Sequence, residues 1–261
     1  MRKDRNITKI LFEVILFTLF PILLNDIGVI ILSIFFATKI LSGRKEWLFK
    51  SLFYLFLFRF LNPVLYDSGV SLLLASWGLL LLVFFITLFK KNKVSHGKLK
   101  YLFIFILSAL ISSIFKSEYP VISLFKLVSF FIGFYSLYIA LGFLNKYELL
   151  RFLFIVWFVL LIFSLPTILI PSIGFERNLT GFQGITNQPN FYGSFNALFG
   201  GTLLILNIFL KFVNLKRIIN IFLISINFYV VILSESRTAL LLLLLCSILI
   251  IFSLTKLKSN N

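Results

Sequence analysis

The sequence predicts an all-α, polytopic integral membrane protein with about ten transmembrane helices and both termini in the cytoplasm. Apolar residues make up 60% of the chain and its mean hydropathy is +1.07. Charged residues make up only 13%, whereas soluble domains carry about 25%. Apolar runs of roughly 15 to 22 residues recur from end to end, and about 20 such residues cross a bilayer. We therefore expect residues 1–261 to form a single transmembrane domain.

The expected spans follow the apolar runs in chain order. The first run is expected to be a transmembrane helix and not a cleaved signal peptide, because further apolar runs follow it and no small-residue cleavage site is evident. The first two and last two spans are short, and either pair could form a shallow hairpin without changing the sidedness of the other loops. The spans are Ile7–Leu24, Gly28–Leu41, Trp47–Tyr66, Val70–Phe89, Leu99–Phe115, Val121–Leu144, Leu149–Ile170, Phe191–Leu210, Ile218–Leu233 and Ala239–Leu254.

Basic residues orient these spans, because loops rich in Lys and Arg stay in the cytoplasm. With the N-terminus inside, 20 of the 25 Lys and Arg residues lie in alternate, cytoplasmic segments. Only Lys116, Arg177 and Arg237 lie in outward loops, and Arg59 and Lys126 lie within spans. The net charge of +16 then reflects a topogenic basic belt that faces anionic lipid, and we expect no nucleic-acid partner.

Neither a metal site nor a disulfide framework is expected. Cys246 is the only cysteine and lies in an apolar run, so no thiolate cluster can form within the chain. His96 is the only histidine, and its neighbours KKNKVSHGKLK mark a solvated loop. The sequence predicts no metal and no cofactor.

One outward segment differs from the rest of the chain. Residues 174–193 read GFERNLTGFQGITNQPNFYG and are rich in Gly, Asn, Gln and Thr. Pro189 restricts Gln188 to an extended conformation, and Asn190 follows near the start of a span, where it could cap the helix. Unpaired amides at such a helix start favour an anion. Three glycines permit tight turns and close approach by a ligand: Gly181, Gly184 and Gly193.

Cationic residues near the outer surface predict an anionic ligand. Arg177 and Arg237 each follow a glutamate, Glu176 and Glu235, so local ion pairing or interfacial anchoring is the alternative. Arg59 is expected about two-thirds of the way outward along its span, and a charge inside a membrane usually faces a cavity.

Lys126 lies near the outer end of its own span, and snorkelling to the interface is the alternative there. Because the guanidinium of an arginine binds phosphate through two parallel hydrogen bonds, a lipid-linked phosphate or pyrophosphate is the expected ligand of these cations.

These residues, in this order, resemble the O-antigen ligase and surface polysaccharide polymerase family. The family pattern is an Arg, a Gly-Phe a few residues on, a Pro-Asn that begins a helix, and a later Ser-x-Ser-Arg that opens another helix. The specific match covers residues 174–240. The corresponding residues here are Arg177, Gly181-Phe182, Pro189-Asn190 and Ser234-Glu235-Ser236-Arg237.

The resemblance implies glycosyl transfer at the outer face of the bacterial plasma membrane, without metal or nucleotide sugar. The donor would be a polyprenyl-pyrophosphate-linked glycan, and other polysaccharide-assembly proteins would be partners. Arg177 and Arg237 would hold the pyrophosphate, with Glu176 and Glu235 as the nearest candidates for a base. We favour a polymerase over a ligase, since nothing identifies a lipid A acceptor. The further substrate-binding candidates are Arg59, Lys126, Gly181, Asn190 and Ser236.

Three alternatives stay open. Family members usually continue with another large outward loop that carries a His, and then more helices, whereas this chain stops at TKLKSNN. It could therefore be a short, split or truncated and inactive member. A flippase-like transporter of lipid-linked oligosaccharide would line its path with Arg59 and Lys126, although no internal repeat supports it. A non-catalytic membrane subunit would tolerate replacement of Arg177 and Arg237.

Overall fold

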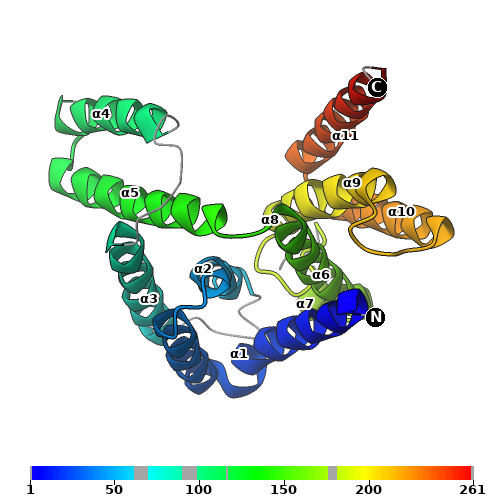
Figure 1. Ribbon diagram of the computed structural model, residues 1–261, viewed down its shortest axis with the longest axis horizontal. Coiled ribbons are helices and arrows are strands. Elements are labelled where there is room, and N and C mark those ends of the chain that lie inside the picture. Colours follow the sequence, from blue (N-terminus) through cyan, green and yellow to red (C-terminus); the bar gives the residue numbers. More distant parts are fainter. Residues whose placement is uncertain (1, 62–69, 90–98, 116, 176–180, 260–261) are drawn as a thin grey trace. The chain divides into compact units, whose positions relative to one another are not determined.

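The computed structural model of the protein describes residues 2–61, 70–89, 99–115, 117–175 and 181–259 (Figure 1). The named elements in these ranges are all helices, and β-pairing there is limited to two isolated bridges. Five helices in these ranges are long and apolar enough to cross a membrane, and three shorter ones are also apolar. The chain is therefore an all-helical membrane protein, while the count of ten spans and the sidedness of the termini stay predictions.

The chain divides into two compact units. The first unit comprises Met1–Gly28, Leu57–Ser68 and Asn145–Asn261, and the second comprises Val29–Phe56 and Gly69–Leu144. Each unit is described by itself below.

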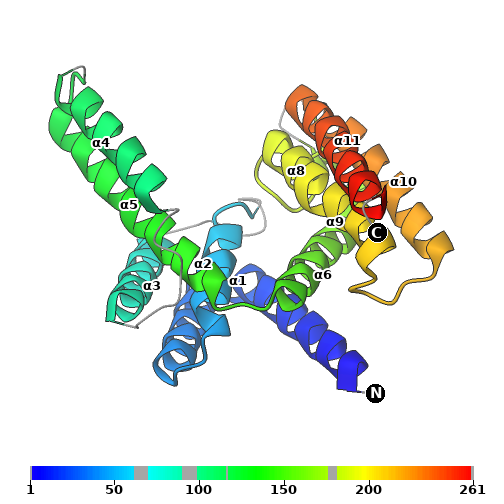
Figure 2. The ribbon, with the colours of Figure 1, turned by 45° about the horizontal axis from the view of Figure 1, so that its top comes forward.

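The second unit contains α3 (Val70–Phe89), α4 (Leu99–Phe115) and α5 (Pro120–Gly142). The bounds of α3 and α4 coincide with the predicted spans, because charged or polar segments flank each apolar run. Proline suits the first position of a helix, where its missing N–H has no partner to lose, and α5 begins at Pro120. Helix α5 packs on both α3 and α4, and Figure 2 shows α4 and α5 side by side.

Helices α1 and α2 belong partly to each unit. Helix α1 (Arg2–Leu41) is interrupted at Asn25, whose φ of 49° and ψ of −132° are not helical. This break lies in the expected gap between the first two spans. Helix α2 (Glu46–Phe58) follows a turn in which Gly43 has a φ of 80°. The third predicted span was wrong at its end, since α2 stops at Phe58 and not at Tyr66.

The first unit is built around one interrupted helix. Helix α8 (Pro189–Phe195) continues through a π-helical segment, η3 (Asn196–Gly201), into α9 (Thr202–Leu210). This stretch packs against α6 (Lys146–Ser164), α10 (Arg217–Leu233) and α11 (Arg237–Ser259). Figure 2 shows α8, α9, α10 and α11 gathered together. Between α6 and α8 the chain forms a 3-10 helix, η2 (Leu165–Leu169), and a single turn, α7 (Pro171–Gly174).

Small and polar residues shape the interior around the π-helical segment. A Cβ on Gly200 would clash with Asn227 and Trp157, and a Cβ on Gly201 would clash with Leu243. The buried indole of Trp157 donates a 3.0 Å hydrogen bond to Oδ1 of Asn196. The π-helical segment begins at the buried Asn196 and ends at Gly200 and Gly201, and these two glycines let α6, α10 and α11 approach closely. Such π-bulges are frequent at functional sites.

Candidate functional site

The glycine loop, residues 181–188, is folded into the first unit. Its residues from Gly181 to Thr186 are all buried. Its backbone amides are satisfied by surrounding elements, as buried backbone must be. The donors and acceptors are Phe182 N to Leu233 O (2.8 Å), Gln183 N to Gly174 O (2.8 Å), Ile185 N to Ser164 Oγ (3.2 Å) and Asn187 N to Phe60 O (2.8 Å).

Two glycines of this loop occupy the left-handed region that favours glycine. The φ angles are 65° at Gly181 and 59° at Gly184, which confirms the predicted tight turns. The close approach at both positions is made by the protein itself. A Cβ on Gly181 would lie 2.9 Å from the Pro189 ring and 3.2 Å from the Ser234 carbonyl, and one on Gly184 would clash with Ser164.

The expectation of a tight turn was wrong for the third glycine, Gly193, because helix α8 already begins at Pro189 and includes it. Gly193 lies within α8, and a Cβ there would clash with Oγ of Ser234. Together with the hydrogen bond from Phe182 to Leu233, this contact joins the glycine loop and the start of α8 to the turn between α10 and α11. The structure thus brings Gly181-Phe182, Pro189 and Ser234 into one place.

The start of α8 differs in detail from the prediction. Gln188 is extended, with φ −152° and ψ 133°, as Pro189 requires. Gln188, and not Asn190, occupies the N-cap position, and no side chain caps this helix start. The expectation that Asn190 caps the helix was therefore wrong, because the helix already begins at Pro189 and Asn190 is its second residue. The side chain of Asn190 is exposed.

The turn that opens α11 places its charged residues outward. Ser236 is 1% exposed, and its Oγ accepts a 3.3 Å hydrogen bond from the amide of Ala239, which is a helix N-cap. Its hydroxyl therefore holds the start of α11. Glu235 has a φ of 53° and, like Arg237, is exposed. Within the described part of the chain, Glu235 and Arg237 form no ion pair, so the guanidinium remains available to an anion.

Arg59 lies at the same loop, although not inside a helix. Helix α2 ends at Phe58, and Phe60 and Leu61 then pair with the glycine loop, Leu61 through a bridge to Thr186. The amide of the Asn187 side chain donates a 3.1 Å hydrogen bond to the carbonyl of Arg59. The expected position of Arg59, two-thirds along a span, was wrong because these tertiary contacts replace further helical turns. Its side chain is exposed.

The remaining predicted site residues lie either outside the described residues or in the second unit. Glu176 and Arg177 lie outside the described residues. Phe175, just before them, pairs with Phe182 through a bridge and a ring contact of 5.3 Å, so both flanks of their segment are held at the glycine loop. Lys126 is an exposed residue of α5 in the second unit and is not among the residues that the first unit brings together.

Several residues that hold the loop were missed from the sequence. Ser164 accepts from the loop backbone, Gln183 donates to the carbonyls of Ile173 and Phe175, and the rings of Phe60 and Phe191 stack at 3.8 Å. The only local signal for Ser164 was its position two residues before Pro166, within the seventh predicted span. The others act through partners that are distant in sequence, so local patterns do not reveal them.

The arrangement offers cations and hydrogen-bond donors around a fixed loop. In the described ranges no cluster of His, Cys, Asp or Glu could hold a metal ion. Two exposed guanidinium groups, from Arg59 and Arg237, belong to segments that are anchored to the same loop. Their chemistry suits a phosphate or pyrophosphate group. No protein-family model, curated protein or solved structure matches this chain.

Proposed function

We propose that this protein takes part in assembling a surface polysaccharide from polyprenyl-pyrophosphate-linked units at the outer face of the bacterial plasma membrane. We favour a polymerase, which joins lipid-linked glycans to each other, over a ligase. The observation that carries the proposal is the contact of Gly181 with Pro189 and Ser234, together with the hydrogen bond from Phe182 to Leu233. The glycine loop, which follows Arg177 in the sequence, is thereby tied to the turn that precedes Arg237.

In this reaction the anomeric carbon of the donor loses its bond to pyrophosphate and gains a bond to an acceptor hydroxyl oxygen. Negative charge grows on the departing pyrophosphate, and arginine donors that are already in place stabilise that charge best. Arg177 and Arg237 fill this role. Arg59 is an additional cation, since its backbone is held by Asn187 of the glycine loop.

The acceptor hydroxyl loses its proton as it attacks. Glu235 is the candidate base among the described residues, because it is exposed and forms no ion pair there. Its φ of 53° is unusual for a residue other than glycine, and such backbone positions cluster at functional sites. Glu176 is the second candidate.

The buried loop supplies the rigid support that a transfer site needs. Backbone hydrogen bonds from Phe182, Ile185 and Asn187 fix the loop to three separate elements. Reacting groups must be held within about 0.5 Å of their productive geometry. We expect the loop to act as a frame, with the charged side chains around it making the contacts to substrate.

The test is replacement of the two arginines in a strain that lacks the native gene. Arg177→Lys and Arg237→Lys keep the charge but lose the two-pronged hydrogen bonding, and we expect a loss of rate on the order of 10²–10³. Polymer length is read from glycan ladders on gels. The matched control is Arg217→Lys, an exposed arginine at the start of α10, which should leave the ladder unchanged.

Normal ladders from both lysine variants would overturn the pyrophosphate clamp and favour a non-catalytic subunit. Glycan analysis of the deletion strain separates the activities. Shortened chains indicate a polymerase, whereas full-length glycan that is not attached indicates a ligase. Lipid-linked units retained on the cytoplasmic side would indicate a transporter and contradict the proposal.

A further inference from the structure

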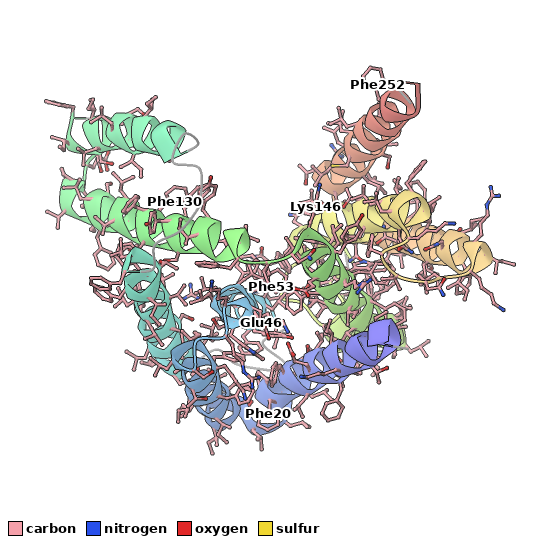
Figure 3. The ribbon with its side chains drawn as sticks, in the orientation of Figure 1. Phe20, Glu46, Phe53, Phe130, Lys146 and Phe252 are labelled. Atoms are coloured by element: carbon pink, nitrogen blue, oxygen red, sulfur yellow. The ribbon has the colours of Figure 1, made fainter. Side chains whose placement is uncertain are left out.

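A second cationic feature lies in the first unit, at the end of α6 that is opposite the glycine loop. Helix α6 begins at Lys146, which Figure 3 marks, and Ser164 at its other end holds the glycine loop. Arg151, near the start of α6, lies about 20 Å from Ser164 along the helix, at a rise of about 1.5 Å per residue. We define the α6–α9 cluster as Lys146, Tyr147 and Arg151 of α6 together with Lys211 and Phe212, which follow α9.

The side chain of Arg151 is held at the loop between α9 and α10. Its Nε donates a 2.7 Å hydrogen bond to the carbonyl of Phe212. This bond brings the exposed Lys211, the neighbour of Phe212 in the sequence, close to the start of α6. A guanidinium carries further N–H donors on its two terminal nitrogens. Arg151 therefore keeps the edge through which an arginine binds two oxygens of one phosphate.

The carbonyl that holds Arg151 belongs to a fixed loop. Phe212 is 2% exposed, and its ring meets the ring of Phe154 edge to face, with centres 5.9 Å apart. The amide of the next residue, Val213, donates a 2.8 Å hydrogen bond to Oδ1 of the buried Asn207. The guanidinium of Arg151 is thus positioned in advance, which lowers the entropic cost of binding a ligand.

The charge of the α6–α9 cluster is not neutralised within the described part of the chain. Lys146, Arg151 and Lys211 form no ion pair with a carboxylate there. The acidic residue nearest to them in sequence, Glu148, is exposed, and the three cations outnumber it. Opposite charges attract more strongly where water is partly excluded. The half-buried Arg151 therefore favours an anionic ligand.

The surroundings favour a lipid over a free anion. Tyr147 is 50% exposed and lies one helical turn before Arg151, on the same face of α6. Phe209 and Leu210, immediately before Lys211, are 52% and 40% exposed. A tyrosine at the end of an apolar helix is typical of the membrane interface. A ligand with a phosphate headgroup and acyl chains contacts the cations and this apolar surface together, whereas a free phosphate contacts only the cations.

We propose that the α6–α9 cluster binds the phosphate headgroup of an anionic phospholipid, with Arg151 and Lys211 as its main contacts. These two cations come from segments that the distribution of basic residues assigns to the same, cytoplasmic side, and the bond from Arg151 to Phe212 joins the segments. The sequence predicts a diffuse belt of basic loops, whereas this proposal assigns one specific site. It does not depend on the proposed transfer reaction.

The experiment measures retention of phosphatidylglycerol by the full-length protein in detergent, using native mass spectrometry over a lipid titration. Each basic residue near an anionic lipid contributes about 1 kcal/mol, which corresponds to roughly a fivefold change in affinity. We therefore expect R151Q/K211Q to weaken binding about 10- to 30-fold. Because Arg151 also holds the loop, Lys211→Gln is measured alone as well. It leaves the bond to Phe212 in place and should weaken binding about fivefold, whereas Lys211→Arg should retain the wild-type affinity.

The matched control is R44Q/K45Q, which removes the same charge from two exposed residues between α1 and α2. Because salt screens a charge that makes no direct contact, this pair should change the affinity less than about threefold. Equal weakening by both pairs would overturn the proposal, since only bulk charge would then matter, and so would wild-type affinity in Lys211→Gln. Equal retention of phosphatidylcholine would show that the headgroup charge is not recognised, and equal competition by glycerol phosphate would show that the acyl chains do not contribute. Either result would also overturn it. Helix content by circular dichroism confirms that each variant is folded.

Discussion

The amide of Phe182 donates a 2.8 Å hydrogen bond to the carbonyl of Leu233. This bond joins the glycine loop to the last residue of α10, immediately before the turn that leads to Arg237. It explains why a polar, glycine-rich segment persists in a chain that is 60% hydrophobic. The segment closes one end of a helical unit through backbone hydrogen bonds, and non-helical backbone in a membrane protein needs such internal partners.

Gly193, the helical glycine that packs against Ser234, should not tolerate an added methyl group. A Cβ at Gly193 would clash with Oγ of Ser234 and lie 3.1 Å from Cβ of Ala239. We expect Gly193→Ala to lower the free energy of unfolding by about 1–3 kcal/mol, as measured by denaturation in detergent.

The matched control for Gly193 is Gly133→Ala in α5, where nothing lies within 4 Å of the added atom. Because Ala favours a helix over Gly by up to about 1 kcal/mol, this control should be neutral or stabilising. Opposite signs for the two substitutions support the packing, and equal effects contradict it.

A comparison of two left-handed glycines separates the effect of backbone strain from that of crowding. Gly43 has a φ of 80° and open space around it, whereas Gly184 has a φ of 59° and lies against Ser164. Gly43→Ala should cost about 1–2 kcal/mol from the backbone alone. Gly184→Ala should cost clearly more, because the loop or Ser164 must also move. Similar unfolding midpoints for the two variants would refute this packing of the loop.

The hydrogen bond between Trp157 and Asn196 should appear as a measurable coupling. Trp157→Phe and Asn196→Leu each remove one partner of the 3.0 Å bond. In membrane proteins such side-chain bonds couple by about 0.6 kcal/mol on average, with values up to about 1.7 kcal/mol. A double-mutant cycle on stability should give a coupling in this range, and strictly additive effects would show that the bond contributes nothing.

The predicted topology can be tested with reporter fusions. The alternation of basic loops places residue 95 in the cytoplasm and residue 180 outside. A phosphatase that is active only outside, fused at each position, should be active at 180 and inactive at 95. A cytoplasmic reporter at the same two positions should give the reverse result. Activity on the same side for both positions would contradict the orientation and the outer location of the proposed site.

The sequence by itself determined the class and most of the helices. Charged or polar residues flank the apolar runs of α3 and α4, so the bounds of both helices could be predicted. Transfer of an apolar helix into lipid does not depend on which other helices pack against it. Local stereochemistry likewise predicted tight turns at Gly181 and Gly184 and the extended Gln188 before Pro189, and the structure has them.

Tertiary structure decided where the site residues lie. Helix α2 stops at Phe58 because Phe60 and Leu61 find partners in the glycine loop, more than a hundred residues further along the chain. The same contacts help to bury the loop and carry Arg59 to it. Hydrogen bonds and packing between segments distant in sequence leave no periodic pattern in either segment, so only the folded structure reveals them.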